Sequence, residues 1–112
     1  QHMAIRSVRT VLVTLSLLCS FAQAHAQQPL THCSNWLKGG AARTVLEHYS
    51  IGYLAGMSTI WDVQQLKPEN PGGRIRKNAD VFLYVDAHCR INGGDDVTVA
   101  VFKLFRELAG QK

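Results

Sequence analysis

Cysteine and proline are few in this sequence, with three of each, and no apolar run is long enough to span a membrane comfortably. Charged residues make up 18% of the 112 positions and apolar residues 46%, which are ordinary globular values and exclude wholesale disorder. The length leaves room for one small domain and excludes two-domain enzymes. Catalytic patterns are missing too: we find no phosphate-binding loop, no nucleophile elbow and no carboxylates at metal-ligand spacing.

The start of the chain has the pattern of a secretory signal peptide. Arg6 and Arg9 give it a positive beginning, and an apolar stretch follows over residues 11–22. Ala24 and Ala26 then place small residues at the positions that signal peptidase prefers. The alternative is an anchor helix that is never cut, but the stretch is short for a membrane span.

These features divide the chain into three parts. Residues 1–2 precede the first methionine and are interpreted as an expression scar, residues 3–26 as the signal peptide, and residues 27–112 as a single helical domain. We expect the mature domain to be periplasmic or secreted, with no stable membrane insertion after signal cleavage. It carries ten Lys and Arg against eight Asp and Glu, a net charge of +2.

Positive charge is too sparse for a nucleic-acid domain, which usually carries a broad basic face. The densest basic run is Arg74, Arg76 and Lys77. We interpret it as a solvated segment, with contact to an acidic partner as the alternative. No nucleic-acid partner is expected.

Cysteine is rare, and its positions favour a disulfide. Cys19 falls in the signal segment, so the mature chain keeps Cys33 and Cys89, an even number in a small exported domain. Each follows a histidine, His32 or His88, which raises the alternative of a zinc site. Adjacent residues rarely both reach one metal, and a catalytic thiolate would need a free cysteine. We therefore expect a disulfide, no metal and no cofactor.

Periodicity predicts a long helix over residues 41–65, separated by glycines at 39–40 from a short helical turn over residues 34–38. Gly52 and Gly56 share one side of the long helix and would let another helix approach closely. Its apolar stripe, at three- and four-residue steps, contains Val45, Tyr49, Gly52, Tyr53, Gly56, Ile60 and Val63, widened by Leu46, Leu54, Met57 and Trp61.

The remainder of the chain predicts a loop and two further helices. Proline and glycine mark a loop over residues 67–73. In residues 74–90, Val81, Leu83 and Val85 alternate as in a strand, but a lone strand would have no partner, so we expect a helix. Its starting cap would be Asn78 or Asp80.

The last predicted helix covers residues 97–108, with Asp95 or Asp96 as its cap and Gly110 at its end. The expected fold is all-α: a small bundle of three main helices plus a short N-terminal turn, with one disulfide. That disulfide would draw the start of the domain onto the junction before the last helix.

Three elements of the sequence carry a resemblance to known families: Cys33 near the mature start, Gly-Tyr-Leu-Ala-Gly at 52–56, and Tyr-Val-Asp-Ala-His-Cys-Arg at 84–90. The chain resembles the HdeA acid-stress chaperone family and is similar to the Rap/Tai-type immunity proteins of bacterial secretion systems. The resemblance implies an exported helical fold, a Cys33–Cys89 bridge and a function that depends on protein contacts, with no catalytic residues to transfer.

We therefore expect a non-catalytic protein that binds a protein partner, as an immunity-type inhibitor or an interaction module. The alternative is a periplasmic acid-stress chaperone, and a weak homodimer is left open. Glu47 and His48 are interpreted as surface residues, and Asp95 and Asp96 as caps. Candidate aromatic anchors are Trp36, Tyr49, Tyr53, Trp61 and Tyr84. The expected partner-binding residues are His48, Tyr49, Tyr53, Glu69, Asn70 and Arg74.

Overall fold

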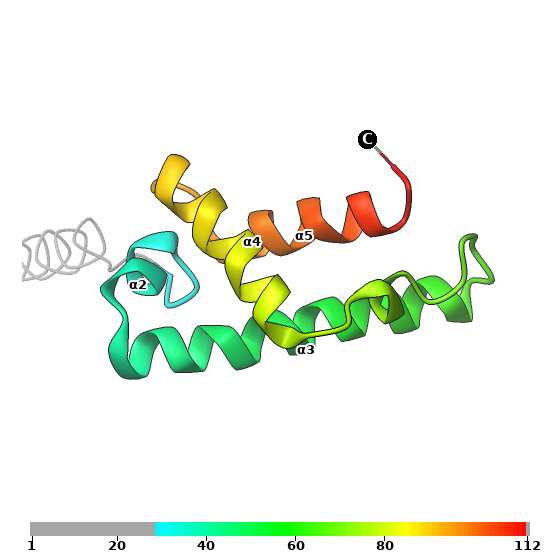
Figure 1. The fold of residues 1–112 in the computed structure, drawn as a ribbon, viewed down its shortest axis with the longest axis horizontal. Helices are drawn as coiled ribbons and strands as arrows, with labels where there is room; N and C mark the ends of the chain where they lie inside the picture. The colour runs from blue at the N-terminus through cyan, green and yellow to red at the C-terminus, as the bar shows by residue number, and fades with distance from the viewer. Residues whose placement is uncertain (1–28, 112) are drawn as a thin grey trace, which may run out of the picture.

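The computed structural model describes residues 29–111 and confirms the all-α architecture (Figure 1). A short helix, α2, is followed by three longer ones, α3, α4 and α5, and residues 29–111 form no strand. The predicted expression scar and signal peptide, residues 1–26, lie outside the described residues.

The first two helices are separated at the predicted glycine pair, where Gly39 lies between them and Gly40 already belongs to the second helix. The His32 ring accepts a hydrogen bond from the Ser34 backbone N–H at 3.0 Å and so caps α2 (Cys33–Lys38). Gly39 ends this helix with a φ of +73°, a conformation that glycine adopts without steric cost. The long helix α3 (Gly40–Val63) begins at the next residue and matches the predicted range to within two residues at either end.

Only part of the apolar stripe predicted on α3 packs against the core. Leu46 and Leu54 are buried and Trp61 is packed against the core, whereas Val45, Ile60 and Val63 are exposed. The buried positions recur every four residues: Leu46, Ser50, Leu54 and Ser58. Gly52 and Gly56 lie on the exposed side, where a Cβ atom would meet nothing within 4 Å, so no other described helix approaches them. Serine can face the core because its hydroxyl finds a partner there; Ser50 Oγ donates to the Leu46 carbonyl at 2.8 Å.

The two remaining helices lie over the buried side of α3 (Figure 1). α4 (Asn78–Ile91) confirms the helical alternative for this region, but its predicted cap is wrong. Its N-cap is Lys77, whose backbone is extended and whose side chain makes no capping bond, so Asn78 already lies inside the helix. α5 (Val97–Leu108) has the predicted bounds, and Asp96 caps it by accepting the Thr98 N–H at 3.0 Å.

All four helices contribute to one core. The Trp61 ring on α3 meets the Phe105 ring on α5 edge to face, with centroids 5.5 Å apart. The fully buried members of the core include Trp36 on α2, Val81 and Val85 on α4, and Val97 and Val101 on α5. A 3-10 helix, η1 (Pro71–Arg74), follows α3 in the chain and packs against α3 and α5.

The predicted Cys33–Cys89 disulfide is confirmed, with Cα atoms 5.2 Å apart and both residues fully buried. Hydrogen bonds reinforce the same junction: the Cys33 N–H donates to the Asp95 carbonyl at 2.9 Å, and the Val97 N–H donates to the Thr31 carbonyl at 2.8 Å. The start of the domain is therefore held against the turn before α5, as the sequence predicted.

Candidate functional site

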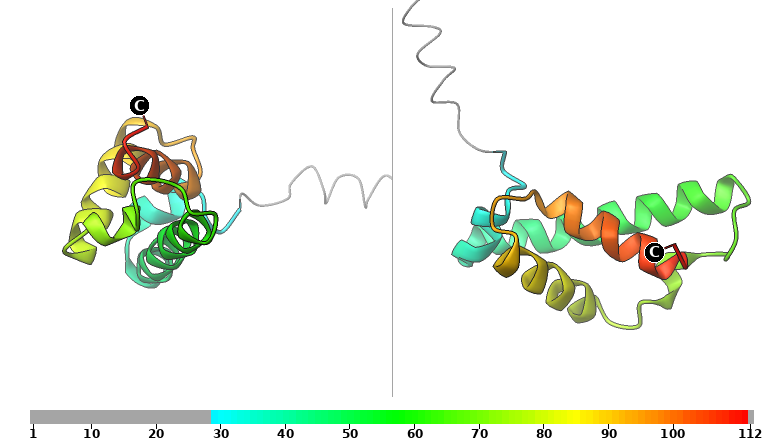
Figure 2. Two further views of the ribbon diagram at one scale, coloured as in Figure 1. Left: turned by 90° about the vertical axis from the view of Figure 1, so that its right-hand side faces the viewer. Right: turned by 90° about the horizontal axis from the view of Figure 1, so that it is seen from above.

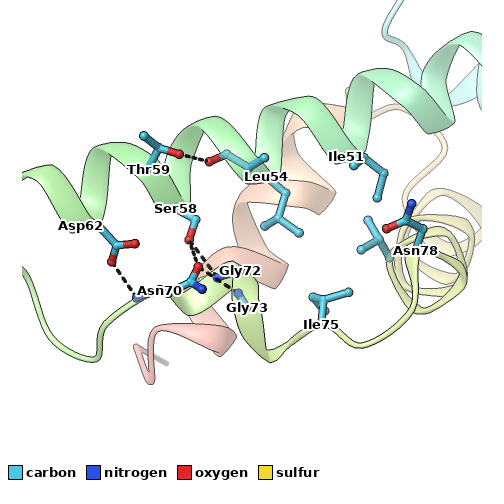
Figure 3. A pocket seen from close by; sticks show the side chains of 12 residues that line it. Ile51, Leu54, Ser58, Thr59, Asp62, Asn70, Gly72, Gly73, Ile75 and Asn78 are labelled. Carbon is cyan, nitrogen blue, oxygen red and sulfur yellow. Dashed lines mark hydrogen bonds between the residues drawn. The ribbon is translucent and has the colours of Figure 1, made fainter.

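The loop between α3 and α4 is fastened to α3 by side-chain hydrogen bonds (Figure 3). The Asn70 backbone N–H donates to Asp62 Oδ1 at 2.6 Å, and Ser58 Oγ donates to Asn70 Oδ1 at 3.0 Å. The same Asn70 oxygen accepts the Gly73 N–H at 3.1 Å, while the Gly72 N–H donates to Ser58 Oγ at 3.0 Å. The loop is thus held in one conformation by groups of its own and by two side chains of α3.

The local sequence explains this loop geometry. Asn70 has a φ of +46°, and asparagine tolerates the left-handed region better than most residues. Pro71 follows at the first position of η1, where its missing N–H costs nothing, and it is buried. A Cβ atom on Gly72 would lie 3.1 Å from Ser58 Cβ, so glycine permits the close approach of η1 to α3. Trp61 adds a hydrogen bond from its indole N–H to the Pro68 carbonyl at 2.8 Å.

A cavity of about 330 Å³, the α3–η1 pocket, opens beside this loop (Figure 3). Its apolar wall is Ile51, Leu54, Ile75 and Val81, and its polar groups include Ser58, Asp62, Asn70 and Asn78. The Ser58 hydroxyl already donates to Asn70 and accepts from Gly72, and no histidine lines the pocket to take its proton. This arrangement is suited to binding an apolar group with polar neighbours rather than to activating a nucleophile.

Uncompensated positive charge borders the α3–η1 pocket. Arg74, Arg76 and Lys77, here named the basic rim, are all exposed and lie on either side of the pocket residue Ile75. Within residues 29–111 none of the three forms an ion pair with a carboxylate. Their charges are therefore available to a ligand outside the chain.

The predicted partner-binding residues fall into two separate groups. Asn70 lines the α3–η1 pocket, and Arg74 lies on its basic rim. Glu69 is exposed on the same loop, where its ion pair with Lys67 lowers the pKa of its carboxyl, chiefly through the hydrogen bond from the ammonium group. Of the three loop residues, only Asn70 lines the α3–η1 pocket.

The three helix residues lie elsewhere, nearer the start of α3. His48 and Tyr49 are exposed and Tyr53 is half-buried. The two tyrosine rings stack with centroids 6.0 Å apart. Burial, followed by the nearby carboxylate of Asp96, raises the pKa of Tyr49. None of these three residues lines the α3–η1 pocket.

Trp36, a candidate anchor by sequence, is fully buried and so cannot be one. Its indole N–H donates to Asp86 Oδ1 at 3.3 Å, and the Arg43 guanidinium lies 4.0 Å above its ring. Arg43 also pairs with Asp86 at 3.5 Å, and Arg90 pairs with Asp86 at 2.6 Å. The hydrogen bond from Arg90 is the main cause that lowers the pKa of Asp86, against an opposing effect of burial.

Sequence reasoning missed this cluster around Asp86, although part of it had a signal. Asp86 and Arg90 stand four residues apart on one helix, the spacing at which opposite charges pair. No such spacing relates Arg43 and Trp36 to Asp86, because Arg43 lies on α3 and Trp36 on α2. The cluster joins three helices and is structural.

Histidine and aspartate also meet at the disulfide junction. His88 is buried, and its Nε2 lies 2.8 Å from Asp95 Oδ2. Asp95 is therefore a partner of His88, and only Asp96 of the predicted pair caps α5. The zinc alternative is excluded for the two cysteines, which are bonded to each other.

Comparison with protein-family models, with curated proteins and with solved structures found no match for this chain. Within residues 29–111, His, Cys, Asp and Glu side chains form no group of three or more that could hold a metal ion. Over the same residues, no helix combines the length and apolar character that crossing a membrane requires.

Proposed function

We propose that this chain is an exported, non-catalytic protein that binds a protein partner, as an immunity-type inhibitor or an interaction module. One observation carries the proposal: Ser58 and Asp62 of α3 hold the loop 67–74 in a fixed conformation beside the α3–η1 pocket. A loop that is ordered before binding loses little entropy when a partner arrives, which favours affinity.

The pocket and its surroundings define the chemistry of the partner. A single apolar side chain fits a cavity of about 330 Å³ with an apolar wall. The basic rim of Arg74, Arg76 and Lys77 favours carboxylates next to that side chain. The partner segment is therefore acidic and presents one large apolar residue, and its association is faster at low salt.

Export supports this proposal. The signal-like pattern of residues 3–26 directs the chain out of the cytoplasm, and a buried disulfide persists in an oxidising compartment. Both features support a periplasmic or secreted location, where partners are other exported proteins or secreted effectors.

Capture from a periplasmic extract at neutral pH tests the proposal with a charge-matched pair of variants. The double variant Arg74→Glu with Arg76→Glu reverses the basic rim, whereas Lys38→Glu with Lys103→Glu makes the same change in net charge on exposed residues elsewhere. We expect a protein that the wild type and the second variant retain and the first variant loses. A retained set that is identical for all three proteins contradicts the assignment of this surface.

The acid-stress chaperone is the second candidate, and carboxylates at the tertiary contacts favour it. Asp86 joins α2, α3 and α4, and Asp96 accepts a hydrogen bond from Thr31 at 2.6 Å. Protonation of both groups in acid weakens these contacts and exposes apolar surface. Suppression of the aggregation of a client protein at about pH 2–3, without specific capture at neutral pH, would favour this candidate over the first.

A further inference from the structure

The connection between η1 and α4 is exposed and carries two adjacent basic residues, Arg76 and Lys77. Neither belongs to a helix, and residues 76–80 are all exposed. Figure 2 shows this connection, in yellow-green, at the outer edge of the molecule. Within residues 29–111, no hydrogen bond holds the backbone N–H of either basic residue. The backbone of the connection is therefore open to a second molecule.

We infer that this connection is the cleavage site of an endopeptidase that cuts after basic residues, and that the cut chain stays in one piece through Cys33–Cys89. The reaction is the addition of water across the peptide bond between Lys77 and Asn78. The C–N bond breaks, the carbonyl carbon of Lys77 takes the hydroxyl group, and the nitrogen of Asn78 takes the hydrogen. Cleavage here does not depend on the proposed function.

The backbone before the cut already has the conformation that a protease binds. An extended peptide pairs with the edge of another protein as an added strand. Ile75, with φ −80° and ψ 118°, and Lys77, with φ −135° and ψ 135°, both have extended backbones. The Ile75 side chain is half-buried and packs against the core, so it anchors this end of the connection. The bound segment must therefore lengthen toward α4.

The first turn of α4 can open to supply that length. Its N-cap, Lys77, makes no side-chain capping bond, so the first N–H groups of the helix lack the acceptor that usually holds them. The first buried residue of α4 is Val81. Opening the turn breaks backbone bonds, including the one from the Asp80 N–H to the Lys77 carbonyl, but it exposes no core side chain. The free-energy cost of this local opening is therefore low.

The other basic residues within 29–111 are poor sites for the same enzyme. Lys67 precedes Pro68, which has no N–H at the bond that would be cut. Lys38 ends α2 and Arg74 ends η1, and in each case the next N–H donates to a carbonyl of the same helix. The remaining four lie inside the long helices: Arg43, Arg90, Lys103 and Arg106.

The disulfide joins the two products. α2 and α3, with Cys33, lie before the cut, whereas α4 and α5, with Cys89, lie after it. α3 packs against α5, and α2 packs against α4, so the core should survive. Ile75 lies before the cut and Val81 after it, and both line the α3–η1 pocket. Cleavage therefore divides the wall of this pocket between two chains.

Limited digestion of the exported, disulfide-bonded protein with trypsin tests the inference. Within residues 29–111 we expect one early cut, which adds the mass of one water molecule. After reduction the product should separate into two fragments, divided after Lys77 or after Arg76. Arg76→Gln with Lys77→Gln should abolish this product. Lys38→Gln with Lys103→Gln makes the same change in charge at exposed residues inside helices and should be cut as quickly as the wild type.

A second pair of variants tests the opening of α4. Ala79→Gly loosens the first turn and leaves both residues of the cut bond in place, so cleavage should be about threefold faster. Ala87→Gly makes the same substitution at an exposed position later in the same helix and should leave the cleavage rate unchanged.

Three results would overturn the inference. The first is an initial cut within residues 29–111 after any basic residue other than Arg76 or Lys77. The second is a chain that resists trypsin until it is cut at many bonds together, as expected if only global unfolding exposes the sites. The third is a cut product that loses its helical circular dichroism while the disulfide is intact.

Discussion

Replacing both Cys33 and Cys89 by alanine should lower the free energy of unfolding by about 4 kcal/mol. The bridge joins positions 56 residues apart, and the cost of closing so long a loop in the unfolded chain is the main source of this value. Both cysteines are fully buried, so the small gaps left by alanine add to the loss. The hydrogen bonds from Cys33 to Asp95 and from Val97 to Thr31 do not need the sulfur atoms, so the native geometry should persist.

Urea denaturation followed by circular dichroism measures this loss. The free energy of unfolding of a small domain falls by about 1 kcal/mol per molar urea. The urea midpoint of the double alanine variant should therefore lie several molar below that of the wild type. The wild type in excess reducing agent is the matched control and should unfold near the midpoint of the double variant. A loss below about 1 kcal/mol would refute the reasoning, because the unfolded chain would then gain little freedom when the bridge is removed.

Three further predictions concern the loop between α3 and α4 and the carboxylate of Asp96. Asn70→Ala should destabilise the domain by about 1–3 kcal/mol in chemical denaturation, because two donors lose their acceptor, whereas Asn70→Asp keeps an acceptor and should cost less. Gly72→Ala should lower the melting temperature, because the added Cβ would lie 3.1 Å from Ser58 Cβ; an unchanged value would show that η1 can move away. The pKa of Asp96 is lowered because hydrogen bonds from Thr31 and Thr98 outweigh the opposing effect of burial. The ionised Asp96 carboxylate therefore stabilises the fold fully above its unfolded-state pKa of about 4. This stabilisation is lost as the pH falls through the lower folded-state pKa. Asp96→Asn should therefore flatten the pH dependence of the free energy of unfolding in that range.

Local patterns predicted most of the helical elements. The final helix was predicted with its observed bounds because Asp96 supplies a cap and Gly110 follows its end. The break at Gly39 was predicted because glycine stops a helix without any help from the rest of the chain. The start of α4 was misjudged because its cap, Lys77, lacks the side-chain oxygen on which cap predictions depend.

The candidate site was only partly predictable. Asn70 and Arg74 were expected on the loop, since proline and glycine mark the segment as exposed. The contacts that Ser58 and Asp62 make with that loop had no sequence signal, because both residues come from a helix that precedes it. The sequence analysis also grouped the loop with Tyr49 and Tyr53, but neither tyrosine lines the α3–η1 pocket beside the loop.

The sequence by itself determined the helical class, the positions of the helices and the pairing of Cys33 with Cys89, because periodicity, caps and cysteine number are local or countable properties. Only the tertiary structure decided which side of α3 faces inward. Val45 and Val63 of the predicted apolar stripe are exposed, whereas Ser50 and Ser58 are buried beside its members Leu46 and Leu54. Small residues admit close neighbours. The Ser50 hydroxyl is satisfied within its own helix by the Leu46 carbonyl, but the partners of Ser58, Asn70 and Gly72, come from the loop that the fold brings to it, which no local pattern records.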